Sequence, residues 1–439
     1  MKKSLLASAI LATLLAPTAA FAEGFGIIEY NAEGVAMGGA AMFVENSAGN
    51  MGYNPAGITL CHGEQVQVNG TYISPHGYSE VQTKPMINPL TMTPIAGSMT
   101  VNCDHNCVHP AWAPGAYYVR QVNEKEWYGL GIFARFGNKS EFYPGSHPAS
   151  NNRYAYMKGI SVTPTYARKS GNKFYWAVGA DINYVGLELQ KNFENGMGFR
   201  HPAAGDITLA GDSGNNKTEG ETWALGWNVG FRYSPTDKDE IGVAYRSKIA
   251  HTMDADFDWY GTGVAGMLAG LPTDFHSRAH GKVTLPDSYH FGYSHKFDNK
   301  NRVEVSAIRT QWHNFRTLDL NIDNFQTISS AHNWKDNWRY AIGYEYKFSK
   351  KYTGMLGFAF DDEGKSYDGG DFMVPIGIHR TYSCGVKYED KRHTIALALA
   401  YQIEGDTNFK SNYETDTYLK AFSHDNTAKI FSIGYTYHF

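Results

Sequence analysis

In the last eleven residues of the chain, KIFSIGYTYHF (429–439), apolar and polar side chains alternate from Phe431 to the end. The apolar parity consists of Phe431, Ile433, Tyr435, Tyr437 and Phe439, and the polar parity of Ser432, Gly434, Thr436 and His438. Successive side chains of a β-strand point to opposite faces, so this stretch predicts a strand with one apolar face. An aromatic residue at the C-terminus on the apolar face, here Phe439, is typical of a barrel of the outer membrane.

Runs of the same kind recur through the chain, among them 174–184, 338–346 and 395–401. A soluble β-sandwich would also alternate, so the connections between the runs must distinguish the two folds. Six connections are short and polar: 122–126, 169–173, 234–239, 297–301, 348–351 and 388–392. Seven are long and rich in glycine and asparagine: 74–110, 136–156, 191–220, 252–280, 313–333, 361–377 and 404–428. Strict alternation of short and long connections predicts an all-β fold, a 14-stranded antiparallel transmembrane β-barrel.

The composition excludes several other classes of protein. A mean hydropathy of −0.42 is incompatible with a bundle of membrane helices, each of which needs about 20 consecutive apolar residues. Aromatic residues at 14% and charged residues at 19% argue against disorder. With 39 basic and 43 acidic side chains, the chain has no electrostatic footprint for nucleic acid.

Residues 1–22 have the layout of a secretory signal peptide. Lys2 and Lys3 form a basic start, residues 5–16 are apolar, and Ala20-Phe21-Ala22 is a small-x-small cleavage site. The apolar run is too short to be a membrane anchor. We expect export by this signal peptide, with the mature chain beginning at Glu23.

A barrel of this size has a lumen that its own side chains cannot fill, because about eight strands is the packed limit. Residues 23–60 precede the first expected barrel strand and are rich in glycine and alanine. Such small residues do not suit a strand that faces lipid. We expect residues 23–60 to form a hatch that plugs a barrel made of residues 61–439; a flexible periplasmic tail is the alternative.

Several short motifs in the expected hatch carry a resemblance. They are Glu23-Gly24-Phe25, Met37-Gly38-Gly39-Ala40, Ser47-Ala48-Gly49-Asn50 and Asn54-Pro55-Ala56. Further matches follow in the same order along the chain: Gly226-Trp227-Asn228-Val229-Gly230, Tyr245-Arg246-Ser247, Leu285-Pro286-Asp287 and Phe358-Ala359-Phe360-Asp361-Asp362. Over nearly the whole mature chain, the sequence resembles the FadL/TodX family of outer-membrane long-chain fatty-acid and hydrophobic-compound transporters.

The resemblance implies a mechanism as well as a location in the outer membrane of a Gram-negative bacterium. In that family a hatch closes a 14-stranded barrel, and an inward kink of the third strand leaves a hole in the wall. By resemblance, Asn54, Pro55 and Ala56 lie against that kink, Gly137 is the kink glycine, and Phe25 is the hatch aromatic that reaches the ligand. Outer loops capture the ligand, the hatch moves, and the ligand leaves sideways into the membrane.

The residues themselves indicate how an amphiphilic ligand could be held. The long loop 252–280 contains Val264, Met267, Leu268 and Leu271, an apolar run that predicts either an outer hydrophobic groove or a loop packed on its neighbours. A carboxylate leaving water needs a cation or hydrogen-bond donors. Strand parity points Arg246 and Arg339 into the lumen, and Lys191 lies at the loop end of the fifth strand. Each could instead be paired with an inward acid, and Glu345 is the partner expected for Arg339.

Four cysteines occur in this exported chain. Cys103 and Cys107 lie close together in the first long loop, and an oxidising compartment favours a disulfide between them. A zinc site with His105 and His109 is the less favoured alternative. Cys384 falls on the apolar parity and is expected to face lipid as a free thiol, while Cys61 has no assignable partner. We expect neither a metal nor a cofactor.

Other functions fit the sequence less well. No spacing assembles a nucleophile, a base and an orienting acid, so we expect no enzyme. A general porin would lack the hatch, and an adhesin or structural barrel would need neither the hatch nor the apolar loop. The predicted function is uptake of long-chain fatty acids, with monoaromatic or other small hydrophobic compounds as the alternative. Expected partners are this ligand, outer-membrane lipid and lipopolysaccharide, but no nucleic acid, and the protein is expected to be a monomer.

Overall fold

The computed structural model describes most of the chain after residue 23. The described residues are 24–83, 86–87, 101–103, 108–143, 147–150, 152–192, 197–201, 205–209, 214–261, 274–315, 317–325, 327–332, 334–362, 364, 372, 377–410 and 419–439. The expected signal peptide, 1–22, lies outside them, and so do Val264, Met267, Leu268, Leu271 and Cys107.

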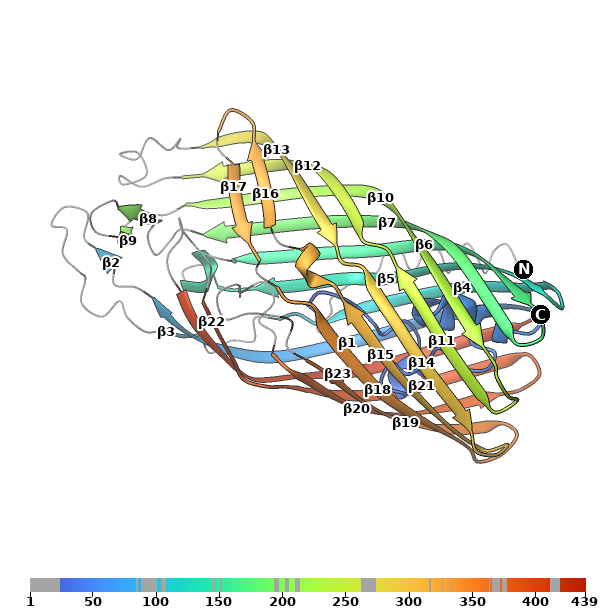
Figure 1. The fold of residues 1–439 in the computed structure, drawn as a ribbon. Coiled ribbons are helices and arrows are strands. Elements are labelled where there is room, and N and C mark those ends of the chain that lie inside the picture. Colours follow the sequence, from blue (N-terminus) through green and yellow to red (C-terminus); the bar gives the residue numbers. More distant parts are fainter. Residues whose placement is uncertain are drawn as a thin grey trace.

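The described strands form a closed, 14-stranded antiparallel barrel, as predicted (Figure 1). Its wall consists of β1 (Glu64–Thr83), β4 (Ala111–Asn123), β5 (Glu126–Glu141), β6 (Tyr154–Ser170), β7 (Phe174–Asn192), β10 (Asn215–Tyr233), β11 (Asp239–Arg246) continued by β12 (Ile249–Tyr260), β14 (Ser288–Lys296) preceded by β13 (Phe275–Leu285), β15 (Asn301–Thr310), β18 (Asn337–Lys347), β19 (Tyr352–Asp361), β20 (His379–Glu389), β21 (His393–Glu404) and β23 (Leu419–His438). The barrel closes because β1 pairs with β4 on one side and with β23 on the other.

All six predicted short turns join neighbouring wall strands, and they lie at the end of the barrel where the C-terminus is found (Figure 1). At the other end the strands run further than predicted. β1 and β23 each have 20 residues, against the expected length of about 10. Beyond the membrane, neither face of a strand meets lipid. The strands can therefore continue there without apolar alternation, and alternation is the pattern from which strand length was predicted.

Shorter strands extend this outer end. β3 (Val101–Cys103) pairs with β1, β16 (Thr317–Ile322) pairs with β13 and β17 (Thr327–Ala331), and β22 (Thr407–Lys410) pairs with β23. β2 (Met86–Ile87), β8 (Met197–His201) and β9 (Gly205–Leu209) form a separate small sheet. The long loops are therefore partly built from strands, which places folded structure above the lumen.

The outer face of the wall is apolar over a limited height. On β10, Trp223, Leu225 and Trp227 are exposed, and Tyr233 is the last aromatic residue before the turn. From Trp223 to Tyr233 the strand rises about 33 Å, and a tilt of about 40° reduces this to about 25 Å, the height of an outer-membrane apolar band. Among the described residues, no helix is both long and apolar enough to cross a membrane.

Residues 24–60, which we call the plug segment, lie inside the lumen as three short helical turns: α2 (Ala32–Ala36), α3 (Asn50–Tyr53) and η1 (Pro55–Leu60) (Figure 1). Asn31 starts α2 by accepting a hydrogen bond from the amide of Gly34 at 2.8 Å. α2 ends at two glycines, because the φ angles of Gly38 (+65°) and Gly39 (+94°) lie in the left-handed region that favours glycine. The Gly-Gly pair is therefore needed to turn the chain within a confined space.

Polar side chains of the wall hold the plug segment from several sides. Arg339 of β18 donates to the carbonyl of Gly38 at 3.0 Å, and Glu304 of β15 accepts from the amide of Met42 at 2.6 Å. On the other side of the barrel, Arg232 of β10 donates to Thr59 at 2.7 Å. Each such bond contributes about 1 kcal/mol, and more where a charged group takes part. The plug segment is thus fixed by many modest contacts rather than by one strong one.

Candidate functional site

The wall of the barrel is interrupted on one side of β5. β4 and β5 pair from Asn123 and Glu126 as far as Gly115 and Phe133, and the ladder then stops. On its other side β5 remains paired with β6 up to Glu141, with one shift of register between Ala134 and Phe136. That shift is a β-bulge, and it bends the strand. Beyond the bulge, β5 has an edge that β4 does not cover.

The plug segment covers the first part of this edge, and residues 108–109 pair with β5 further on, at Lys139 and Ser140. Gly26 forms a bridge with Phe136, the amide of Ile27 donates to the carbonyl of Arg135 at 2.8 Å, and the amide of Gly137 donates to the carbonyl of Phe25 at 2.9 Å. The start of the plug segment therefore takes the place of a wall strand. Gly137 lies at this contact, two residues beyond the bulged Arg135, and its φ is not in the left-handed region.

The outer face of the wall is recessed at the same place. Four apolar side chains point outward by strand register, and their residues are only 1% to 6% exposed: Ala116, Ile132, Ala134 and Ile160. The outward-facing Leu225, by comparison, is 72% exposed. The wall is thus folded inward beside the bulge. Alternation along the sequence could not reveal this, because it predicts which face a side chain occupies but not how far the strand is displaced.

Phe25 forms the inner side of this contact. Its ring packs against Trp312, Phe315 and Trp334, with ring centroids 4.7, 5.0 and 5.6 Å away, and against Phe136 at 6.0 Å. We call these five residues the aromatic box. The box is buried, and it joins the start of the plug segment to the segment after β15 on the far side of the lumen. A single side chain therefore connects the interrupted wall with the lumen interior.

An apolar cluster extends from the aromatic box toward the outer end of the barrel. Its members on the neighbouring strands β7, β12 and β13 include Val185, Leu187, Ile249, Met253, Phe257, Trp259, Val283 and Leu285. All of them are buried and on the lumen side of their strands. The inner surface thus offers an apolar lining in its outer half, in contrast to the polar interior usual for a water-filled porin.

A buried charge cluster lies next to the bulge. The Arg135 guanidinium contacts the Asp181 carboxylate at 2.7 Å, and the Arg246 guanidinium contacts the same carboxylate at 3.3 Å. Arg246 also donates to the carbonyl of Met51 in the plug segment at 2.6 Å. Two guanidinium groups share one carboxylate, so this charge cluster has one surplus positive charge. Sequence reasoning identified Arg246 as facing the lumen but missed Arg135 and Asp181, although alternation along β5 and β7 places both side chains on the lumen face.

The other predicted cations lie elsewhere. Arg339 forms an ion pair with Asp361, and not with Glu345 as we expected; Glu345 pairs instead with Arg302 at 2.6 Å. Parity placed Arg339 and Glu345 on one face, but six residues along a strand separate them by about 20 Å. Lys191 is half-buried near the outer end of β7, ten residues from Asp181, so it does not join the charge cluster.

The Asn-Pro-Ala tripeptide also lies in a different place from the one the resemblance implied. The side-chain amide nitrogen of Asn54 donates to the carbonyl of Phe231 on β10 at 3.0 Å, and Pro55 packs over Gly230. Asn54 also caps η1 by accepting from the amide of Ala56 at 2.9 Å. The tripeptide therefore fixes the plug segment to β10, while residues 25–27 occupy the bulge in β5.

The remaining predicted sites are the cysteines and a possible metal site. Cys384 is exposed and free, as predicted, and Cys61 is free and buried. The Cys103–Cys107 disulfide remains a prediction because Cys107 lies outside the described residues. Within the described part of the chain, no group of three or more His, Cys, Asp or Glu side chains could hold a metal ion.

Comparison with known proteins agrees with this architecture. The family described as outer membrane protein transport protein (OMPP1/FadL/TodX) matches residues 13–439. The chain belongs to this family. It is therefore an outer-membrane protein of a transporter family and not a barrel enzyme, in agreement with the prediction.

Individual members of the OMPP1/FadL/TodX family are distant in sequence. A putative outer membrane protein of Neisseria meningitidis serogroup B is 25% identical, with 100% of this chain and 99% of the relative covered. The long-chain fatty acid transport protein of an Escherichia coli O6:H1 strain is 22% identical, with 98% and 97% covered. These two relatives match the chain over nearly its whole length.

Solved structures of the family share the fold. A FadL homologue of Pseudomonas aeruginosa aligns with a TM-score of 0.82 at 20% identity, covering 95% of this chain and 100% of the homologue. The toluene transporter TodX of Pseudomonas putida aligns with a TM-score of 0.68 at 17% identity, covering 95% and 99%. At these identities the likeness establishes the fold and leaves the ligand open.

Proposed function

We propose that this member of the OMPP1/FadL/TodX family takes up long-chain fatty acids and releases them sideways through the wall beside β5. The observation that carries the proposal is the replacement of β4 by residues 25–27 of the plug segment along the edge of β5. A wall strand could not leave without opening the whole barrel. A segment held by two backbone hydrogen bonds and one aromatic side chain can be displaced.

The energetics favour displacement by an apolar ligand. Burying a tail of about 16 carbons gains on the order of 0.8 kcal/mol per methylene, or about 12 kcal/mol in all. The two backbone hydrogen bonds at the edge of β5 contribute about 1 kcal/mol each, and truncating a buried phenylalanine typically costs about 3–5 kcal/mol. A tail that enters the apolar cluster and takes the place of Phe25 can therefore compensate for the contacts it breaks.

The charge cluster favours an anionic ligand over a neutral one. Arg135 and Arg246 share the single carboxylate of Asp181, and Arg135 is the bulged residue beside the recessed wall. A fatty-acid carboxylate moving along the apolar lining would find the surplus positive charge at the level of the opening. Toluene, which TodX of Pseudomonas putida is described as transporting, carries no charge and would not need this cluster.

Capture by the outer loop 252–280 remains part of the proposal. The described strands at its two sides, β12 and β13, contribute Met253, Phe257 and Val283 to the apolar cluster. Val264, Met267, Leu268 and Leu271 would extend that lining outward. Passage past these residues toward Phe25 would give a ligand several weak sites in series, which permits release as well as binding.

A reversible disulfide between the plug segment and β5 tests lateral release. Gly26 and Phe136 face each other between the two backbone hydrogen bonds, the arrangement in which Cα atoms approach to about 4.5 Å and a disulfide can form. The G26C/F136C variant should take up labelled oleate at least tenfold more slowly when oxidised, and recover on reduction. As a control, A36C/S383C joins the plug segment to β20 near an existing 3.0 Å hydrogen bond, away from the opening.

The result is decided by comparing the two locked variants. Full cross-linking of G26C/F136C with undiminished oleate uptake would contradict lateral release beside β5. A loss in both variants would show that the whole plug segment must move, which the proposal does not require. Competition by unlabelled toluene, and mass spectrometry of lipid extracted with the native protein, separate a fatty-acid ligand from a monoaromatic one.

A further inference from the structure

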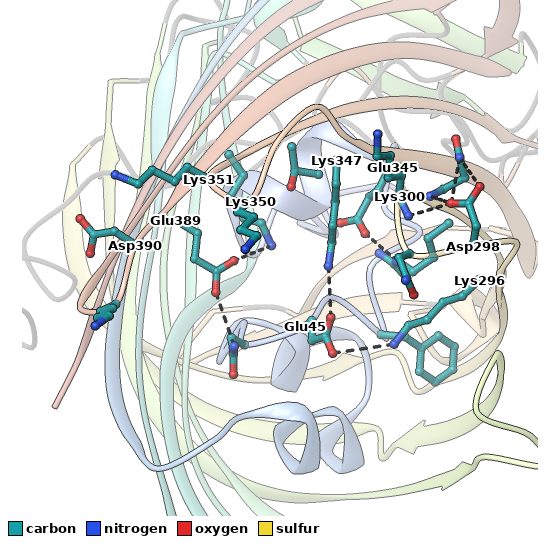
Figure 2. Close-up of a pocket in the computed structure, with 18 of the residues that line it drawn as sticks. Glu45, Lys296, Asp298, Lys300, Glu345, Lys347, Lys350, Lys351, Glu389 and Asp390 are labelled. Atoms are coloured by element: carbon teal, nitrogen blue, oxygen red, sulfur yellow. Dashed lines mark hydrogen bonds and ion pairs between the residues drawn. The ribbon is translucent and has the colours of Figure 1, made fainter.

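A cavity of about 1240 Å³ opens at the end of the barrel that carries the short turns (Figure 2). In outer-membrane barrels this end faces the periplasm. Ten lysine and arginine residues line the cavity against six acidic ones. The cavity lies at the opposite end of the lumen from the apolar cluster and plays no part in the proposed passage of ligand. Its surplus of positive charge attracts anions from the periplasm.

One of the six acids comes from the plug segment. Glu45 extends into the cavity between Lys347, whose ammonium lies 3.5 Å from its carboxylate, and Lys296 at 3.8 Å (Figure 2). The next residue, Asn46, turns the chain with a φ of +55° and donates to Glu389 of β20 at 3.5 Å. Burial alone would raise the pKa of Glu45, but Lys296, Lys347 and Lys387 outweigh it and hold that pKa below its ordinary value. The lowest turn of the plug segment is therefore held by charge.

Lys387 distinguishes this cavity from a merely solvated basic surface. Its side chain is only 6% exposed, Glu389 lies 3.9 Å away, and Lys387 also acts electrostatically on Glu45 and Glu345. Among the described residues its ammonium group has no hydrogen-bond partner. The stem of Lys387 is enclosed while its ammonium group lines the cavity, so the charge is held in place and is suited to a further anion. By contrast, Lys350 and Lys351 at the same cavity are exposed.

We propose that Lys296, Lys347 and Lys387 form a binding site for an oxyanion, a carboxylate or a phosphate group, that reaches the cavity from the periplasm. We call these three residues the lysine cradle. Glu45 occupies the cradle in this structure, and the incoming anion displaces it. Exposed ion pairs such as those of Glu45 contribute little to stability, so the exchange is easy. Displacement of Glu45 frees the turn at residues 45–46 at the periplasmic end of the lumen. The aromatic box still holds the start of the plug segment.

Binding measured on the purified full-length protein in a neutral detergent tests the cradle. Isothermal titration with inorganic phosphate and, separately, with octanoate shows which oxyanion it accepts. E45Q removes the internal competitor and keeps the shape, so it should bind the preferred anion about tenfold more tightly. K387M should bind about tenfold more weakly. K351Q removes a charge from the same cavity outside the cradle, and its affinity should stay within twofold of the wild type.

Hydrogen exchange gives a second readout that does not depend on the titration. The preferred anion should accelerate exchange of the amides at residues 45–46 at least threefold in the wild type, and should have no such effect in E45Q. Equal weakening by K387M and K351Q would show diffuse attraction only and would overturn the proposal. So would an unchanged affinity in E45Q, or no binding of either anion by wild type and E45Q. K296Q replaces K387M if the latter does not fold.

Discussion

At the scale of single residues, the buried arginines of the lumen differ in whether their charge is balanced by a carboxylate. Arg339 is paired with Asp361 and bonded to the carbonyl of Gly38, so its charge is balanced and its role is to fix the plug segment. Arg246 also holds a plug carbonyl, but it shares Asp181 with Arg135. Of the two, only the cluster of Arg246, Arg135 and Asp181 leaves positive charge available to a ligand. Strand parity could not distinguish the two arginines, because it places both in the lumen.

The replacement R246M tests this difference. It removes the surplus charge and leaves the Arg135–Asp181 pair neutral. We expect affinity for oleate to fall about tenfold, equivalent to about 1.4 kcal/mol, while affinity for oleyl alcohol stays unchanged. K191Q is the matched control, because Lys191 lies away from the charge cluster and should affect neither ligand. An equal loss for oleate and oleyl alcohol would show that Arg246 acts through the plug segment alone.

At the scale of elements, the bulge in β5 is the feature on which the opening depends. The extra residue, Arg135, bends the strand away from β4, and the plug segment then pairs with the free edge. Backbone groups need partners wherever water is scarce, and residues 25–27 supply them along the first part of the β5 edge. In the proposed function, a ligand passes where these residues are displaced. The bulge thus interrupts the wall, and the plug segment supplies the missing backbone partners.

Deletion of Arg135 should restore an unbroken register between β5 and β6. We expect β5 to straighten and pair with β4 beyond Phe133, so that oleate uptake falls at least tenfold in a barrel that still folds. R135M is the control, because it removes the same charge and keeps the bulge. If the two variants transport oleate equally well, the bulge is not required for transport. Migration of unheated and heated samples on gels checks that both barrels are folded.

A second element-scale feature lies at the outer ends of β12 and β13. Three outward-facing acids on β12 oppose three bases on β13: Asp254 with His280, Asp256 with Arg278, and Asp258 with His276. Charges on the outer face show that this part of the hairpin lies beyond the apolar band. Hydrogen bonds to the carboxylates of Asp254 and Asp323 raise the pKa of His280 above its ordinary value.

The raised pKa predicts a pH dependence for this hairpin. A group whose pKa is higher in the folded state contributes stability below its ordinary pKa and loses that contribution as pH rises through the folded value. Amide protection factors at residues 254–256 and 278–280 should therefore decrease between pH 6 and pH 9. H280Q should remove this change, whereas replacement of His62, which lies away from the hairpin, should not. A decrease that persists in H280Q would assign the effect to another group.

At the scale of the whole molecule, the plug segment is held at two ends by different forces. Near the apolar cluster, Phe25 is held by aromatic packing, which an apolar tail can replace. At the periplasmic end, Glu45 is held by lysines, which an anion can occupy. Between these ends, Asn54, Met42 and Gly38 are bonded to facing strands. Displacement of one end is therefore compatible with a plug segment that remains in the lumen.

Much of this architecture could be predicted because it depends on local pattern. Each turn such as 297–300 or 390–392 follows from where the alternation stops, and Cys384 is exposed because its parity is apolar. The partners of buried charges could not be predicted in the same way. The Arg339–Glu345 pairing was wrong because parity specifies a face and not a height along the strand, and the Asn-Pro-Ala tripeptide was misplaced because no local pattern states which strand a lumen segment touches.

The sequence by itself determined the strands, their faces, the asymmetry of turns and loops and the presence of a small-residue segment before the barrel. These properties follow from side-chain alternation and turn composition, which act between residues close in the chain. Only the tertiary structure decided that residues 25–27 complete the wall beside β5, that Arg135 and Arg246 share Asp181, and that Glu45 lies among three lysines. Each of these contacts joins distant parts of the chain, and closure of the barrel brings them together.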